Sequence, residues 1–203
     1  MTDAEVCEMS NKNNIILIGM PGCGKSTVGV VLAKTLGYRF MDSDLVIQEK
    51  DGRLLSKIIE QEGIDGFNKI ENEVNASIDV KNTVVATGGS VVYGREAMRH
   101  LSDIGTVVYI RLPYKIIRKR LGDLKKRGVS IREGQTLRGL YDERSVLYEH
   151  YADIIIDPVG KNIPETVKLI KKKLKEVREN DNGKGKSPDK GNSKTDISRK
   201  GKA

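Results

Sequence analysis

Short apolar runs alternate along the chain with longer segments in which apolar residues recur every three or four positions. The runs predict strands that are buried on both faces of a sheet. They lie at 15–18, 38–41, 83–87, 106–112 and 154–156. The longer segments predict amphipathic helices. These lie at 27–36, 44–50, 54–62, 67–78, 96–101, 113–121, 136–151 and 164–177, and Gly63 is expected to end the third of them.

Regular alternation of strands and helices predicts an α/β fold, in which a parallel sheet is covered by helices on both faces. The chain has 203 residues and no internal repeat, which suits one well-buried domain. Ligands of such sheets bind at the carboxyl ends of the strands. Gly19, Asp42, Gly88 and the turn near Asp157 all fall at predicted strand ends. We therefore expect the functional site to lie there.

The strongest chemical signal is the segment 19–27, which reads G-M-P-G-C-G-K-S-T between the first predicted strand and the first predicted helix. Glycines at this spacing let the backbone turn its N–H groups toward an anion, and the following helix adds the positive end of its dipole. In such a loop Lys25 would bridge the outer phosphates and Ser26 would ligate Mg²⁺. The alternative is a turn that merely contains glycines. The flanking elements favour a nucleoside triphosphate site.

Charge and cysteine content exclude few classes of function. The formal net charge is +8, and residues 180–203 hold six Lys and one Arg against three Asp, a net +4. We expect 179–203 to be a disordered basic tail and nucleic-acid binding to be unlikely. The longest apolar run is too short for a membrane span, the first 14 residues do not read as a secretory signal, and Cys7 and Cys23 cannot form a disulfide framework. These features predict a reduced, cytoplasmic protein.

Residues 123–135 differ from the rest of the domain, because they are basic, contain two glycines and have little apolar content. This composition predicts a mobile basic lid rather than packed structure.

These motifs, in this order, resemble the shikimate kinase family of small P-loop phosphotransferases over about residues 13–178. The matching pieces are the loop at 19–27, D-S-D at 42–44, A-T-G-G at 86–89, the basic segment with Arg127, and D-E-R-S-V-L-Y-E-H-Y-A-D at 142–153. The resemblance implies a three-layer P-loop kinase fold with a five-stranded parallel sheet and a lid. It also implies a flexible segment at 1–12, a kinase domain at 13–178 and acceptor-binding helices at about 44–79.

On the nucleotide side, the resemblance implies that Lys25 and Arg127 are catalytic and neutralise the charge of the transferring phosphoryl group. Ser26 and, through water, Asp42 would hold Mg²⁺. Arg120 would stack on adenine, although a solvated helix face explains it equally well. The implied ATP-binding residues are Gly22, Cys23, Gly24, Lys25, Ser26, Thr27, Arg120, Arg127 and Lys161.

On the acceptor side, the resemblance implies that Asp44 binds acceptor hydroxyls and is the candidate base, while Arg144 grips a carboxylate. The alternatives are that Asp42 and Asp44 cap and begin a helix, and that Arg144 pairs with a nearby acid on its own helix. Two positions depart from the family pattern, since Asn68 replaces an arginine and Ser90 replaces a third glycine. The implied substrate-binding residues are Asp44, Asn68, Gly88, Gly89 and Arg144.

The expected activity is Mg²⁺- and ATP-dependent phosphorylation of a hydroxyl on a small carboxylate-bearing alcohol. Shikimate, converted to 3-phosphoshikimate in aromatic amino acid biosynthesis, is the leading acceptor, and we expect a monomer. One alternative is a kinase of the same fold that acts on homoserine, threonine or a nucleotide. Another is a non-enzymatic nucleotide-binding switch, and a third is an RNA-binding protein that acts through its basic tail.

Overall fold

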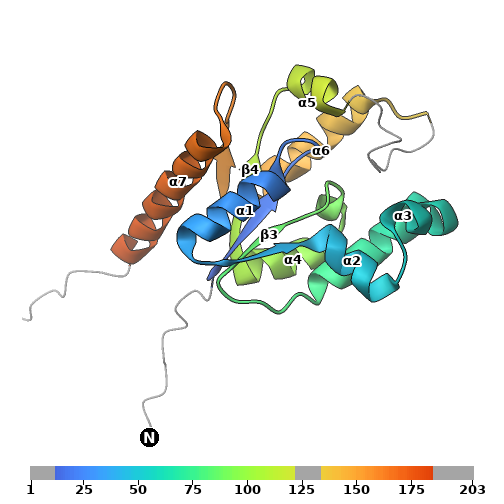
Figure 1. The fold of residues 1–203 in the computed structure, drawn as a ribbon, viewed down its shortest axis with the longest axis horizontal. Coiled ribbons are helices and arrows are strands. Elements are labelled where there is room, and N and C mark those ends of the chain that lie inside the picture. Colours follow the sequence, from blue (N-terminus) through green and yellow to red (C-terminus); the bar gives the residue numbers. More distant parts are fainter. Residues whose placement is uncertain (1–11, 122–133, 185–203) are drawn as a thin grey trace, which may run out of the picture.

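A five-stranded parallel sheet forms the centre of the described part of the chain (Figure 1). The computed structural model describes residues 12–121 and 134–184. The strand order is β2-β3-β1-β4-β5. The strands are β1 Asn14–Ile18, β2 Arg39–Asp42, β3 Thr83–Ala86, β4 Gly105–Ile110 and β5 Ile154–Ile156. Because β1 lies between β3 and β4, the loop that follows β1 opens at the centre of the carboxyl edge.

Helices cover both faces of this sheet, as the sequence predicted. They are α1 Lys25–Leu36, α2 Ser43–Asp51, α3 Leu55–Ala76, α4 Arg95–Ile104, α5 Tyr114–Leu121, α6 Leu137–Tyr151 and α7 Ile163–Lys184, with one 3₁₀ turn, η1 Val91–Tyr93. α1 and α7 pack together on one face of the sheet, and α4 and α6 lie on the other. The α2–α3 unit extends to one side of the sheet (Figure 1).

Every predicted strand is confirmed to within about two residues, and the predicted helix break at Gly63 is confirmed as well. Gly63 was expected to end a helix, and its backbone is non-helical, at φ 71° and ψ −178°, so that α3 consists of two helical segments that meet at a kink there. The helix resumes because residues on both sides of the break enter one small apolar cluster. This cluster contains Ile47, Ile58, Phe67 and Val74, and it fixes α2 against α3.

The main differences are the end of α7 and one short turn. α7 runs to Lys184, seven residues past the predicted end at Val177 and into the segment expected to be the disordered tail. The turn η1 was not predicted, because three residues are too short to show a period.

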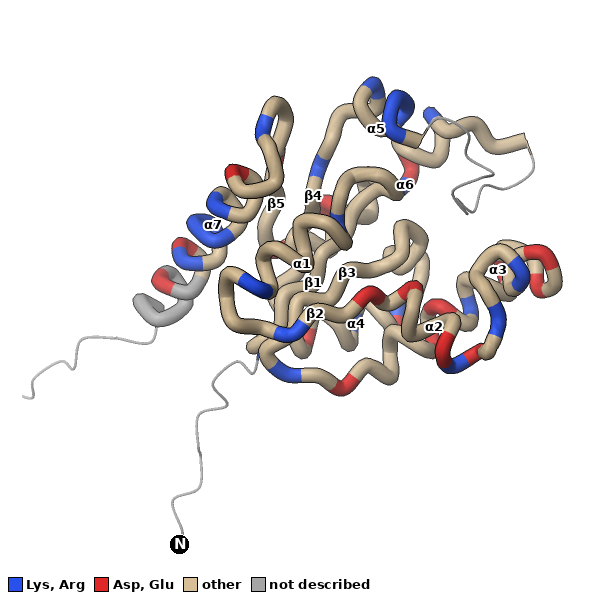
Figure 2. Tube along the Cα trace, in the orientation of Figure 1, with Lys and Arg blue, Asp and Glu red and all other residues tan. Residues whose placement is uncertain are grey.

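The charges of the described residues are interspersed rather than gathered on one face. Lys and Arg alternate with Asp and Glu along α3 and α7, and basic residues are denser on α5 (Figure 2). None of the helices in the described ranges has the length and apolar content needed to cross a membrane. The predicted lid with Arg127, the basic segment beyond α7 and Cys7 lie largely or wholly outside the described residues.

Candidate active site

The loop between β1 and α1 adopts a conformation that only glycines allow. Gly19, Gly22 and Gly24 have φ values of 141°, 77° and 107°. A Cβ on Gly19 would lie 2.8 Å from the carbonyl oxygen of Ile110, too close for any side chain. Gly24 precedes α1 and provides no side-chain cap for the first N–H groups of that helix. These N–H groups are therefore available to an anion, and the helix dipole favours negative charge there.

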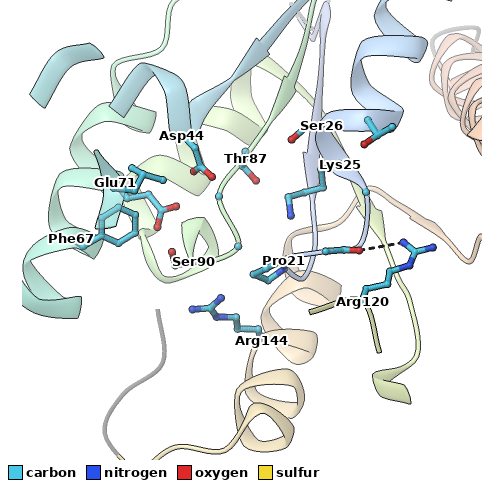
Figure 3. A pocket seen from close by; sticks show the side chains of 16 residues that line it. Pro21, Lys25, Ser26, Asp44, Phe67, Glu71, Thr87, Ser90, Arg120 and Arg144 are labelled. Carbon is cyan, nitrogen blue, oxygen red and sulfur yellow. Dashed lines mark hydrogen bonds between the residues drawn. The ribbon is translucent and has the colours of Figure 1, made fainter. Parts of the chain in front are cut away.

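Lys25 lies inside this loop and is only 8% exposed. Its Nζ donates to the carbonyl oxygens of Gly19 at 2.8 Å and Met20 at 3.2 Å. The ammonium group is thus held by the loop itself and faces the adjoining cavity (Figure 3). A phosphate entering the loop would meet a cation that is already in place.

Ser26 and Asp42 meet beside the loop, at the ends of α1 and β2. The Ser26 hydroxyl donates to Asp42 Oδ2 at 2.7 Å, and Asp42 Oδ1 accepts from the backbone N–H of Asp44 at 3.1 Å. Asp42 is therefore the N-cap of α2, as the alternative interpretation proposed, and it also faces Ser26. Mg²⁺ prefers hard oxygen ligands, and at nucleotide sites it usually binds one or two protein oxygens together with phosphate oxygens. The Ser26 hydroxyl and the Asp42 carboxylate are ligands of this kind.

The main cavity has a volume of about 430 Å³ and opens beside the loop. Side chains from α1, α2, α3, α6 and the segment after β3 converge on it (Figure 3). Its lining residues are Pro21, Gly22, Gly24, Lys25, Ser26, Thr27, Asp44, Leu55, Phe67, Glu71, Thr87, Gly88, Gly89, Ser90, Arg120 and Arg144.

One wall of this cavity is acidic and is formed by Asp44 of α2 and Glu71 of α3. A Cβ on Gly88 would collide with Glu71 Oε1 and lie 2.8 Å from Asp44 Oδ1, so both carboxylates crowd against this glycine. Burial raises the pKa of Asp44, Asp42 raises it further, and Lys25 opposes the shift. A raised pKa makes a carboxylate a stronger base and therefore suits it to accept a proton.

Glu71 is 1% exposed, and burial raises its pKa to about 7. A hydrogen bond from Ser90 lowers this pKa, the charge of Asp44 raises it, and Arg144 and Lys25 lower it. Glu71 Oε1 has no hydrogen-bond partner among the described residues. Ser90, where the family pattern has a third glycine, therefore acts on this carboxyl group.

The opposite wall is basic and is formed by Arg144 of α6, which is 2% exposed. Arg144 Nε donates to the hydroxyl of Tyr93 at 3.3 Å, and the guanidinium carbon lies 5.1 Å from the centre of that ring. These contacts with Tyr93 restrain the guanidinium group. The Arg144 side chain points into the cavity (Figure 3). A guanidinium fixed in this way can bind a carboxylate through two hydrogen bonds.

A second cavity of about 190 Å³ lies behind the loop, between the ends of β4 and β5. It is lined partly by Cys23, Thr27, Arg120 and Lys161. Arg120 Nη1 donates to the carbonyl oxygens of Gly22 and Cys23, both at 3.2 Å, and so it contacts the phosphate loop rather than only solvent. The position of this cavity next to the loop suits the base of a nucleotide.

Asn68 is the predicted site residue that the structure places apart from the main cavity. It lines a small adjoining pocket with Tyr93 and Arg144, and its buried Oδ1 has no partner within the described ranges. The other predicted residues that the structure describes line one of the two cavities, apart from Asp42, which contacts Ser26. Arg127 lies outside the described residues.

Glu71 is the main residue that the sequence analysis missed. The apolar stripe of α3 includes Phe67 and Val74, and position 71 falls on the same face. An acidic residue on an apolar stripe is a signal of a buried carboxylate, and it could have identified Glu71.

A model of the shikimate kinase family matches residues 21–175. A shikimate kinase of Clostridium botulinum is 40% identical over 79% of this chain and 96% of its own length. A shikimate kinase of Actinobacillus succinogenes is 41% identical over 73% of this chain and 87% of its own length. Among solved structures, shikimate kinase from Acinetobacter baumannii in complex with shikimate is similar, with a TM-score of 0.71 and 34% identity. The similarity covers 84% of this chain and 96% of that chain.

Proposed function

The chain belongs to the shikimate kinase family, and we propose that it transfers the γ-phosphoryl group of ATP to a ring hydroxyl of shikimate. The similarity to a shikimate kinase solved with shikimate supports this acceptor. One observation carries the proposal beyond family membership. Asp44 and Arg144 face each other across a cavity whose third side is the Lys25 loop (Figure 3).

This arrangement matches the two ends of a hydroxylated carboxylate. Arg144 would bind the carboxylate, which leaves the hydroxyls of the ring pointing toward Asp44 and the phosphate loop. The raised pKa of Asp44 makes this carboxylate a better base than an exposed aspartate, and it would hold or accept the proton of the attacking hydroxyl. Asp44 is therefore the proposed base.

Phosphoryl transfer depends mainly on charge neutralisation and alignment. Lys25 would neutralise the β- and γ-phosphates, and the N–H groups that begin α1 would hold their oxygens. Ser26 and Asp42 would hold Mg²⁺, which supplies positive charge to the phosphates when bound. Arg127 and the segment 123–135 would close over the site and exclude water, so that ATP is not simply hydrolysed.

We also propose that the enzyme acts as a cytoplasmic monomer. The buried Cys23 within the phosphate loop is a free thiol. A reducing compartment suits such a thiol.

An acceptor panel tests the proposed function. Purified protein would be incubated with Mg-ATP and with shikimate, homoserine, threonine or a nucleoside monophosphate, and the products identified by mass spectrometry and ³¹P NMR. We expect a phosphomonoester from shikimate alone. A phosphorylated product from another acceptor, with none from shikimate, would overturn the proposed acceptor but not the kinase activity. ATP binding without any phosphorylated product would favour the nucleotide-binding switch.

A further inference from the structure

Tyr148 is buried directly beneath the acceptor cavity. It follows Arg144 by one turn of α6, so both side chains leave the same face of that helix. Its hydroxyl donates to the carbonyl oxygen of Gly89 at 2.5 Å and lies 4.0 Å from the sulfur of Met20 in the phosphate loop. Its ring packs on Tyr109 with centroids 5.0 Å apart.

The Gly88–Gly89 turn that receives this hydrogen bond is held at both ends. The N–H of Gly88 donates to the hydroxyl of Ser43 at 3.3 Å, and Ser43 immediately precedes Asp44 in α2. The carbonyl of Gly89 is held by Tyr148, which shares α6 with Arg144. The turn therefore joins the helix that carries the proposed base to the helix that carries the proposed carboxylate-binding arginine.

Gly89 has little room to move between these contacts. A Cβ at this position would meet the ring of Pro21 at 2.6 Å and Arg144 Nη1 at 3.2 Å. The peptide thus lies between the phosphate loop and the guanidinium group. A shift of the Gly89 peptide toward Pro21 or Arg144 would displace these residues, because the peptide packs closely against both.

We propose that Tyr148 is a positioning residue for phosphoryl transfer. Its hydroxyl holds the Gly88–Gly89 turn in place and thereby fixes the distance between Asp44 and Arg144. That distance positions the bound acceptor relative to the phosphate loop. The ordinary alternative is that the hydroxyl only satisfies a buried carbonyl. That alternative predicts a loss of stability with no selective effect on the acceptor.

The test is Tyr148→Phe, which keeps the packed ring and removes only the hydroxyl. The proposal rests on the proposed function, so kinetics are measured with shikimate and Mg-ATP. We expect kcat/KM for shikimate to fall about tenfold, because a small misplacement of a bound reactant is costly. The KM for ATP should change by less than about twofold.

Tyr141→Phe is the matched control. Tyr141 lies on the same helix, and its hydroxyl also donates to a backbone carbonyl, that of Leu112, at 3.1 Å. Its loss should leave kcat/KM for shikimate within about twofold of the wild type. Equal losses in both variants, or a lower melting temperature of Tyr148→Phe with unchanged acceptor kinetics, would overturn the proposal.

Hydrogen–deuterium exchange separates this proposal from the proposed function, because it needs no substrate. In the ligand-free protein, Tyr148→Phe should speed exchange in peptides that cover 87–93, and Tyr141→Phe should not. If the wild type fails to phosphorylate shikimate, the proposed function is wrong, and exchange alone decides the positioning role. Unchanged exchange at 87–93 in Tyr148→Phe would then refute it.

Discussion

Replacement of Glu71 by glutamine should change how the stability of the protein depends on pH. The carboxyl of Glu71 is buried, and its pKa rises from the ordinary 4.5 to about 7 in the folded protein. The folded state therefore binds this proton more tightly than the unfolded state does. The stabilisation that this proton provides is complete below pH 4.5 and is lost as the pH rises through about 7.

The size of this effect follows from the interval between the two pKa values. Each pKa unit corresponds to about 1.36 kcal/mol, so ionisation of Glu71 costs the wild type about 3 kcal/mol of unfolding free energy between acid and alkaline pH. The glutamine side chain of the variant cannot ionise and escapes this cost. Any hydrogen-bonding or packing energy that the variant loses would be a constant offset.

Urea denaturation followed by circular dichroism at pH 5, 6, 7 and 8 measures the effect. The unfolding free energy of Glu71→Gln minus that of the wild type should increase by about 2–3 kcal/mol from pH 5 to pH 8. Glu73→Gln is the matched control, because Glu73 is on the same helix but exposed, and its difference from the wild type should stay nearly constant. A difference for Glu71→Gln that does not change with pH would refute the reasoning.

Three further substitutions test the phosphate loop and the acidic wall of the main cavity. Lys25→Ala should lower kcat by at least about 100-fold, because it removes the cation held in the phosphate loop, and near-normal turnover would contradict the mechanism. Gly88→Ala should raise the KM for shikimate about tenfold without affecting the KM for ATP, because its Cβ would push against Asp44 and Glu71. Equal changes in both KM values would indicate a general disturbance of the fold instead. Asp44→Asn should lower kcat by about 100-fold or more, because it removes the proposed base. In the wild type, kcat/KM should fall toward acid pH with a midpoint above 3.8. A pH profile that stays flat down to pH 4 would exclude Asp44 as the base.

The nucleotide half of the site could be predicted because its chemistry is encoded locally. The spacing of Gly19, Gly24 and Lys25 specifies a backbone path within one short segment, and the flanking strand and helix fix where it lies in the sheet. Asp42 and Asp44 follow directly from the end of β2. The positions of residues within one turn or at one strand end can be predicted without knowing which distant residues they contact.

The acceptor half depends on contacts between distant segments, which the sequence pattern does not contain. Tyr148 and Gly89 are 59 residues apart, and nothing near either residue indicates their hydrogen bond. Asn68 follows Phe67 on α3, but the next helical position points about 100° away, so it lies in a different pocket. The kink at Gly63, by contrast, was predicted, because a glycine that adopts a positive φ is a local helix-breaking signal.

The most direct test of the central claim is ADP release by the purified wild-type protein with Mg-ATP over a range of shikimate concentrations. A cavity with Arg144 on one wall and Asp44 on the other predicts strong, saturable stimulation by shikimate over a low rate without acceptor. Release that shikimate does not stimulate, while ATP still binds, would contradict the claim. It would leave the phosphate loop functional and assign the acceptor cavity to a different substrate.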